Sequence, residues 1–217
     1  MPIKEPRFVE PAPQVIAEMP DCRVRSFRRG DIEAVQRHLC DPEVWRSYLP
    51  EDGSPNIKPH YIENYLRWLH TPDVFAFAAC DAATDEVIGC VHARMAQGAM
   101  SRCAELSGWL GRPYWGSSIA RRVNQVFVDW LFREQGVLRV SSQTYHPNRA
   151  AVGTLRAAGF TLEARLRNAG LKDGYLMDRL IYVRLNPATD AMPRAPARDG
   201  GWLKRLQATA DAGPCAA

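Results

Sequence analysis

Residues 109–122 read WLGRPYWGSSIARR, and this stretch decides the fold. The chain leaves an apolar strand that ends at Leu110, turns through Gly111 and Gly116, and enters an amphipathic helix at about Ser117. Small residues at the start of a helix let backbone N–H groups approach an anion closely. The unpaired N–H groups and the helix dipole also favour negative charge there. The stretch therefore predicts a phosphate site.

The spacing of this stretch differs from that of the common nucleotide-binding loops. The pattern GxxxxGK[ST] is absent, and GxGxxG follows none of the expected strands. Arg121 and Arg122 lie in the first turn of the expected helix, where positive charge is unfavourable unless an anion lies between them and the loop. These features argue against a P-loop or Rossmann domain and favour another phosphate-containing ligand.

The loop resembles the pyrophosphate-binding loop of the GNAT acetyltransferases, whose usual form is R/Q-G-x-G-x-G/A. The matching positions are Trp115, Gly116, Ser117, Ser118, Ile119 and Ala120. Trp115 replaces the Arg or Gln of the pattern, and Ser118 replaces its second Gly. The resemblance implies that this loop binds the pyrophosphate of acetyl-CoA. The hydroxyl of Ser118 is expected to donate a hydrogen bond to phosphate rather than to crowd it.

The resemblance covers roughly residues 22–185. Residues 148–160, NRAAVGTLRAAGF, resemble the helix after the fifth strand, and residues 162–185 resemble the closing hairpin of the branch with the ribosomal-protein N-terminal acetyltransferases. The implied fold is a single α/β GNAT domain with a mixed, mostly antiparallel, splayed sheet of six to seven strands flanked by helices. An extended lead-in over residues 1–21 is expected before the domain. A tail over residues 186–217, rich in Ala, Pro and Gly, is expected to be disordered.

Hydrophobic periodicity predicts the elements of the domain. Strands are expected at residues 23–27, 74–81, 87–95, 103–110 and 138–145, before two strands in the closing hairpin. Helices are expected from Asp31 to about Cys40, over residues 58–70, from about residue 117, and over residues 150–158. The loop with Asp52, Gly53 and Pro55 borders the acceptor site in the resembling fold.

The resemblance implies a cofactor site made largely by the backbone. Pantetheine amides are expected to pair with the exposed strand edge near Trp109 and Leu110, much as an added strand would. Cofactor contacts are expected from Trp109, Leu110, Trp115, Gly116, Ser117, Ser118, Ile119, Ala120, Arg121 and Asn148. Trp115 either packs on the cofactor or anchors the loop in the core, and anchoring is the preferred role. Asn148 either touches the pantetheine arm, caps the following helix, or does both.

The implied chemistry is direct attack of a primary amine on the thioester of acetyl-CoA. Glu105 begins the strand that leads into the loop, and in the superfamily an acid on this strand often serves as the base. Its alternative role is an exposed carboxylate or an ion pair with Arg102 or Arg139. Ala151 and Leu155 occupy positions where relatives place a Ser or a Tyr that donates a proton. Departure of the thiolate without a dedicated acid is therefore expected.

Composition is that of an ordinary globular domain, with 24% charged residues and a formal net charge of +4 over 217 residues. The arginines are scattered singly, which argues against a nucleic-acid partner. Six cysteines show neither CxxC nor His at zinc spacing, so no metal and a reducing compartment are expected. With no signal peptide and no run of apolar residues long enough for a membrane span, a cytoplasmic protein is expected.

These observations leave three functions open. The preferred hypothesis is an acetyl-CoA-dependent N-acetyltransferase that acts on a protein or peptide α-amine or on a small-molecule amine. The alternative is a catalytically weak or inactive acyl-CoA-binding regulatory relative, motivated by Ser118, Ala151 and Leu155. A nucleic-acid-binding module is the third. Acetyl-CoA is expected as co-substrate, without a metal or a membrane partner, and a homodimer is left open as the assembly.

Overall fold

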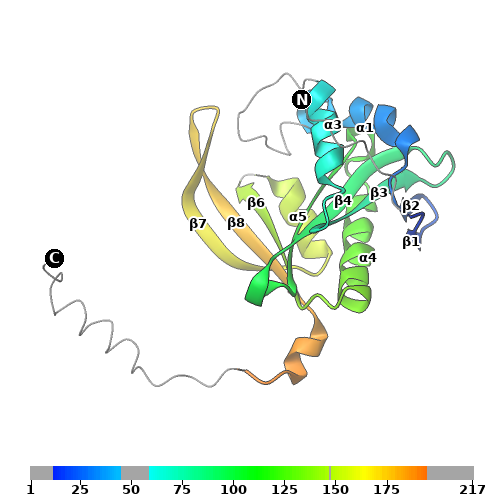
Figure 1. Ribbon diagram of the computed structural model, residues 1–217. Helices are drawn as coiled ribbons and strands as arrows, with labels where there is room; N and C mark the ends of the chain where they lie inside the picture. The colour runs from blue at the N-terminus through cyan, green and yellow to red at the C-terminus, as the bar shows by residue number, and fades with distance from the viewer. Residues whose placement is uncertain (1–11, 45–58, 147, 195–217) are drawn as a thin grey trace, which may run out of the picture. The chain divides into compact units, whose positions relative to one another are not determined.

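A mixed sheet forms the framework of the chain (Figure 1). The computed structural model describes residues 12–44, 59–146 and 148–194. By its contacts the chain divides into two units, residues 1–186 and residues 187–217. The sheet belongs to the first unit, and the described part of the second contains a short 3₁₀ helix at Pro187–Ala191.

The sheet has eight strands in the order β1-β2-β3-β4-β5-β6-β8-β7. Their bounds are β1 Val15–Glu18, β2 Cys22–Arg25, β3 Val74–Asp81, β4 Val87–Met95, β5 Cys103–Leu110, β6 Arg139–His146, β7 Thr161–Lys172 and β8 Tyr175–Leu185. Neighbouring strands are antiparallel except β5 and β6, which are parallel. The predicted mixed, mostly antiparallel sheet is confirmed, with eight strands in place of six to seven.

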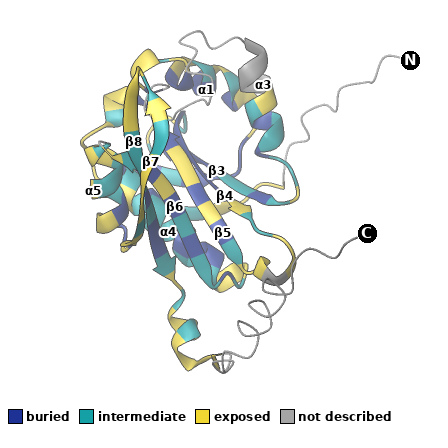
Figure 2. Cartoon of the chain, turned by 90° about the vertical axis from the view of Figure 1, so that its left-hand side faces the viewer, coloured by how far each residue is buried: buried dark blue, intermediate teal, exposed yellow. Residues whose placement is uncertain are grey.

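Amphipathic helices cover both faces of this sheet. Their bounds are α1 Ile32–Leu39, α3 Pro59–Trp68, α4 Ile119–Glu134 and α5 Arg149–Ala157. Because side chains alternate between the faces of a strand, Val91 of β4 joins a core with Phe127 of α4, whereas the adjacent Cys90 joins a second core with Leu39 of α1 and Leu66 of α3. Figure 2 shows the same alternation as dark blue and yellow along β5. One face therefore carries α4 and α5, and the other carries α1 and α3.

The sheet splays between its two parallel strands. Their pairing runs from Cys103 with Arg139 to Leu106 with Ser142 and then stops, although both strands continue. On its other edge β5 stays paired with β4 as far as Leu110. This close pairing depends on Gly108, because a Cβ there would lie 2.3 Å from the backbone oxygen of Cys90. The predicted splay is confirmed, and it opens a gap beside the last residues of β5.

Strand β1 lies inside the segment that the composition predicts to be an extended lead-in. Val15–Glu18 pairs antiparallel with β2 and adds an edge strand to the sheet. Its four residues and the prolines before it carry no strand pattern in the sequence, and pairing with β2 orders them. Residues 1–11, the loop with Asp52, Gly53 and Pro55, and residues 195–217 lie outside the described residues.

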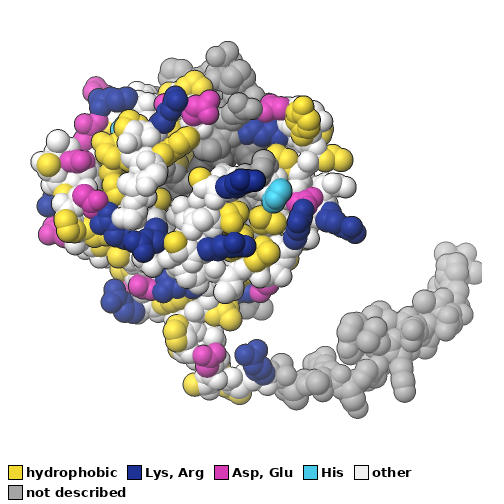
Figure 3. Space-filling model, turned by 180° about the vertical axis from the view of Figure 1, so that it is seen from behind, with side chains coloured by type: hydrophobic (Ala, Val, Ile, Leu, Met, Phe, Trp, Pro, Cys, Tyr) yellow, Lys and Arg dark blue, Asp and Glu magenta, His cyan; other side chains and the backbone are white. Residues whose placement is uncertain are grey.

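Basic side chains are dispersed over one face of the molecule. On the face shown in Figure 3, Lys and Arg side chains are interspersed with acidic and apolar side chains. The scatter of basic residues along the sequence is thus also a scatter over this face. No helix in the described ranges is both long and apolar enough to cross a membrane.

Candidate active site

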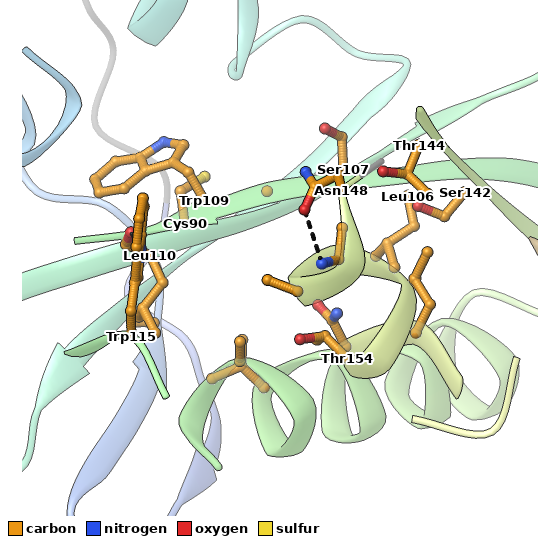
Figure 4. A pocket seen from close by; sticks show the side chains of 18 of the residues that line it. Cys90, Leu106, Ser107, Trp109, Leu110, Trp115, Ser142, Thr144, Asn148 and Thr154 are labelled. Atoms are coloured by element: carbon orange, nitrogen blue, oxygen red, sulfur yellow. Dashed lines mark hydrogen bonds between the residues drawn. The ribbon is translucent and has the colours of Figure 1, made fainter. Parts of the chain in front are cut away.

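A cavity of about 370 Å³ lies where β5 and β6 separate. Its wall is built from the end of β5, the loop before α4, the middle of β6 and the first turns of α4 and α5. Figure 4 shows Trp109, Leu110 and Trp115 at one end and Ser142 and Thr144 at the other. The splay of the sheet, rather than a single loop, therefore creates the cavity.

The loop before α4 presents unpaired backbone N–H groups at one end of the cavity. Gly116 has φ +77°, a conformation that a side chain disfavours, and no atom lies within 4 Å of where its Cβ would stand. The hydroxyl of Ser117 donates to the carbonyl of Tyr114 at 2.6 Å and accepts the N–H of Ile119 at 3.3 Å. Among the described residues, no acceptor binds the N–H groups of Gly116, Ser117, Ser118, Ala120 and Arg121. The loop thus places several unpaired backbone donors at the start of a helix, an arrangement that can bind an anion.

Ser118 does not take the place that the sequence suggests. Its φ of −82° suits any residue, and it lies outside the cavity lining. Its hydroxyl instead accepts a hydrogen bond from Nε of Arg122 at 3.2 Å, while Nη2 of Arg122 pairs with Asp21 at 2.6 Å. The hydroxyl expected to donate to phosphate thus accepts from Arg122 and keeps its own proton free, so its bond to phosphate stays a prediction, whereas Ser117 is the serine of the pair that lines the cavity.

Other expected loop contacts divide between side chain and backbone. Ile119 is 5% exposed and belongs to the core, so only its backbone is available to a ligand. Arg121 is exposed and lies outside the cavity lining, whereas Ala120 lines it. The anion end of the cavity therefore consists mainly of main-chain atoms, as the sequence predicts.

Trp115 bridges the loop and the end of β5. The expectation that it anchors the loop in the core is wrong, because its side chain is 44% exposed and lines the cavity. Its indole Nε1 donates to the carbonyl of Leu110 at 2.7 Å. This hydrogen bond fixes the ring beside the strand end without burying it, so an exposed aromatic face borders the anion site.

The strand edge that faces the gap is at Gly108 and Leu110. Gly111 donates its N–H to Ile88 of β4 at 2.7 Å, and the carbonyl of Trp109 also points to β4, 2.7 Å from where a Cβ on Gly89 would stand. Backbone groups alternate in direction along a strand, so those of Gly108 and Leu110 point away from β4. The predicted pairing edge is thus corrected from Trp109 to Gly108, while the indole of Trp109 still lines the cavity.

A chain of buried polar groups supports the cavity from the α3 side. Trp109 donates from Nε1 to the Tyr65 hydroxyl at 3.2 Å, and that hydroxyl donates to Sγ of Cys90 at 3.4 Å. Burial raises the pKa of the Cys90 thiol to about 12, so the thiol is neutral. His92 packs edge-on against Trp68, and burial lowers its pKa to about 3. These groups form a neutral, rigid floor rather than a set of proton donors.

Helix α5 supplies the opposite wall of the cavity. The side chain of Asn148 accepts the N–H of Ala151 at 3.1 Å, so the predicted N-cap is confirmed, and Asn148 also lines the cavity (Figure 4). Ala151 and Leu155 line the same wall and carry no proton donor. Thr154, which the sequence interpretation misses, contributes a hydroxyl-bearing side chain there.

Glu105 lies on the α1 and α3 side of the sheet, outside the cavity lining. It is opposite Arg94 of β4 and Ser141 of β6, and two residues before Ser107, which lines the cavity. Its carboxylate is exposed and forms no hydrogen bond or ion pair with the described residues. The expected alternative of an ion pair with Arg139 is not formed, because Arg139 pairs with Glu163.

Several polar lining residues escape the sequence interpretation. They are Ser107, Asn124, Ser142, Gln143, Thr144 and Thr154. The signal available for those on β6 is the run SSQT in the middle of a strand that the sheet buries, since polar residues in such a strand need partners. Within the described residues, no group of three or more His, Cys, Asp or Glu is placed to bind a metal ion.

Comparisons with known proteins agree with this geometry. A family described as an acetyltransferase (GNAT) domain matches residues 22–161. No curated protein matches the chain by sequence. A ribosomal-protein-S5-alanine acetyltransferase from Vibrio fischeri is 20% identical, with a TM-score of 0.66, over 82% of this chain and 98% of that chain.

Two further solved structures contain coenzyme A. RimL, a ribosomal L7/L12 α-N-protein acetyltransferase in complex with coenzyme A, has a TM-score of 0.70 at 17% identity, over 81% of this chain and 99% of that chain. Spermidine N-acetyltransferase from Vibrio cholerae, in complex with CoA and spermine, has a TM-score of 0.65 at 20% identity, over 76% of this chain and 96% of that chain. At these identities the likeness establishes the fold alone.

Proposed function

The chain belongs to the GNAT acetyltransferase family, and on that premise we propose that it transfers an acetyl group from acetyl-CoA to a primary amine by direct attack. The observation that carries the proposal is the cavity in the splay. Unpaired N–H groups lie at its α4 end, a strand edge without a partner strand lies along the end of β5, and the carboxylate of Glu105, unpaired among the described residues, lies on the neighbouring face. Together these supply an anion site, a pairing edge and a base.

The residues present fit acetyl-CoA. The pyrophosphate would accept hydrogen bonds from the loop N–H groups at Gly116 to Arg121, where the helix dipole adds to the attraction. The pantetheine amides would pair with the backbone at Gly108 and Leu110 as an added strand. Trp115, which is exposed beside both, would cover the bound cofactor. Coenzyme A in the RimL and spermidine acetyltransferase structures supports this choice of ligand.

The chemistry follows from these positions. Acetyl-CoA supplies a thioester carbonyl, and a backbone N–H on the free edge of β5 would stabilise the negative charge that develops on its oxygen during attack. Glu105 would remove the proton of the acceptor ammonium, directly or through water, because its carboxylate is exposed and has no hydrogen-bond or ion-pair partner among the described residues. Ala151 and Leu155 offer no acid, so the thiolate would leave unprotonated, which a thiol with an ordinary pKa permits.

The acceptor is proposed to be the α-amine of a protein or peptide. RimL and the S5-alanine acetyltransferase act on ribosomal proteins by their names, and the spermidine enzyme acts on a polyamine. A single amine beside a single carboxylate suits Glu105 better.

The direct test is acetyl-CoA turnover against a panel of peptides, amino acids and polyamines. Release of free thiol should accompany the appearance of an acceptor heavier by one acetyl group, measured by mass spectrometry. Acetyl-CoA should also raise the melting temperature of the protein, since a ligand that binds only the folded state stabilises it. Binding without transfer to any amine would favour the regulatory acyl-CoA-binding relative, and no binding at millimolar acetyl-CoA would overturn both functions.

A further inference from the structure

Arg179 of β8 carries a partly buried positive charge that no carboxylate of the described residues neutralises. Its Nη1 donates to the Gln143 side-chain oxygen at 3.2 Å, and its Nη2 donates to the carbonyl of Ala169 at 3.3 Å. Both acceptors are neutral. Its Nε is buried and has no hydrogen-bond partner within the described part of the chain. A guanidinium with neutral acceptors and an unpartnered Nε can still bind an anion.

A second arginine on the same strand, Arg184, has a carboxylate partner. Arg184 also lies over an aromatic ring, with Cζ 5.6 Å from the centroid of Phe132, and also has a buried nitrogen without a partner in the described ranges. However, its Nη2 pairs with Asp129 at 2.7 Å. Arg179 lies 5.8 Å over Tyr145 and has no such pair among the described residues. The difference between these matched arginines is therefore the missing carboxylate.

The position of Arg179 relates it to the acceptor side of the site. Arg179 is opposite Tyr145 of β6, and Glu105 is opposite Ser141 of β6. Because residues at alternate positions of a strand share a face, Ser141, Gln143 and Tyr145 all lie on the face that carries Glu105. Gln143 also lines the cavity, so the guanidinium is fixed to a residue of the cavity wall.

The spacing defines what an acceptor can offer to both groups. Gln143 lies on the strand next to Glu105 and two residues beyond Ser141, the residue opposite Glu105. The backbone distance between Glu105 and Gln143 is therefore roughly 8 Å. An extended peptide rises about 3.3 Å to 3.6 Å per residue. An amine at Glu105 therefore places an oxygen about two residues further along within reach of Arg179.

We propose that Arg179, held by Gln143, is a specificity-determining residue that binds a carboxylate close to the acetylated amine. This inference rests on the proposed function and names the substrate class: an acceptor with an acidic group about two residues from its α-amine. The Arg179 guanidinium makes a charge-assisted hydrogen bond to that carboxylate and repels the second ammonium of a polyamine. A free acidic amino acid carries the same two groups as an acidic peptide N-terminus, but closer together.

The test compares acceptors and variants in one assay. The acceptors are peptides that begin with Ala, carry Asp or Asn at the second or third position and end in an amide, together with free aspartate, free glutamate and spermidine. For the wild-type protein, kcat/KM for the better Asp peptide should exceed that for its Asn counterpart by about tenfold, mainly through KM. Acetylation of free aspartate or glutamate that depends on Arg179 would identify a small molecule as the source of the carboxylate.

Variants then assign the preference to Arg179. Arg179→Gln should reduce the Asp to Asn ratio to about one and leave the Asn peptide within about threefold of wild type. Arg179→Lys should restore part of the ratio, since it restores the charge but not the fork of N–H groups. Arg184→Gln, at the matched arginine with a carboxylate partner, should leave the ratio unchanged. Melting temperatures of all three variants show whether each one folds.

The outcomes separate this inference from the proposed function. Transfer by the wild type without a preference for Asp, or a preference that survives Arg179→Gln in a folded variant, overturns the role of Arg179 and leaves acetyl transfer standing. A preference for spermidine over every peptide also overturns it. Failure to acetylate any acceptor, with acetyl-CoA bound, overturns the proposed function itself and this inference with it.

Discussion

One end of the site consists of backbone groups, and the other consists of side chains. The anion end, at the start of α4, consists of backbone N–H groups held by Gly116 and by the hydroxyl of Ser117. The end proposed to hold the acceptor, on the α1 and α3 face, consists of side chains, of which Glu105 and Arg179 lack an oppositely charged partner among the described residues. In the proposed function, pyrophosphate would bind the unpaired N–H groups of the first end, and the acceptor would bind the unpaired side chains of the second.

This difference explains what each end tolerates. Backbone groups are the same whatever the residue, so the anion end keeps its N–H groups although Trp115 and Ser118 depart from the family pattern. What it requires is geometry, and Gly116 provides that through its positive φ. The acceptor end has no such redundancy, because one carboxylate or one guanidinium carries each role. Variants should therefore affect the two ends in different measurements.

The largest effect is expected from Gly116→Asp. A carboxylate would enter an anion site at a φ that side chains disfavour, and it would repel the pyrophosphate. Acetyl-CoA affinity should fall by about a thousandfold or more, as for the loss of two or more charge-assisted hydrogen bonds. Calorimetric titration measures the affinity. The control is Gly98→Asp, because Gly98 also has positive φ, +63°, and open space at its Cβ. Equal loss in both variants would show that strain, not charge, is responsible.

The next effect is expected at the other end, from Glu105→Gln. Loss of the base should lower kcat by about a hundredfold or more and leave the affinity for acetyl-CoA nearly unchanged. Glu163→Gln is the control, since Glu163 is also an exposed strand carboxylate but pairs with Arg139 outside the cavity. Steady-state kinetics across neutral and mildly alkaline pH would measure both. If the Glu105→Gln variant turned over acetyl-CoA at the wild-type rate, Glu105 would not be the catalytic base.

The sequence predicts features that have a local signature, and it does not predict contacts that form only when distant strands pair. Bounds of β3, β4 and β5 match the predicted ranges, because runs of mainly apolar residues ended by turns define them locally. The anion loop is also predictable, since glycine and a helix start leave a local signature. Arg179 and Gln143 are not, because they meet only through the pairing of β6 with β8, which no local pattern records. The role of Ser118 stays a prediction, because its hydroxyl accepts a hydrogen bond from Arg122, four residues along the helix, and keeps its own proton free to donate.

A smaller and more gradual effect is expected from the buried floor beneath the acceptor end. Burial lowers the pKa of His92 from 6.5 to about 3, so between these pH values the unfolded chain binds a proton that the folded chain excludes. The contribution of His92 to stability is therefore complete above pH 6.5 and is lost as the pH falls toward 3. The free energy of unfolding should decrease by about 1.4 kcal/mol per pH unit from this group.

The measurement for His92 is urea unfolding at several pH values within that window. His92→Gln, which cannot take up the proton, should show a shallower dependence of stability on pH than the wild type, whatever its stability at neutral pH. Because the floor is neutral, acetyl-CoA affinity at neutral pH should change little in the variant. Parallel pH dependences for the two proteins would mean that other groups account for the acid sensitivity.

The smallest effect is expected from the two serines of the anion loop, and it sharpens the contrast within a single turn of chain. Ser117 holds Tyr114 and Ile119 through its hydroxyl and lines the cavity, so Ser117→Ala should loosen the loop and weaken acetyl-CoA binding by about fivefold, the equivalent of one hydrogen bond. Ser118→Ala removes only an exposed contact with Arg122, which Asp21 still holds, and should change the affinity by less than about twofold. Calorimetric titration of both variants with acetyl-CoA shows which one loses more affinity. If Ser118→Ala proved the more damaging, the Ser118 hydroxyl would donate to the phosphate while it accepts from Arg122, and a side chain would then share the anion end with the backbone.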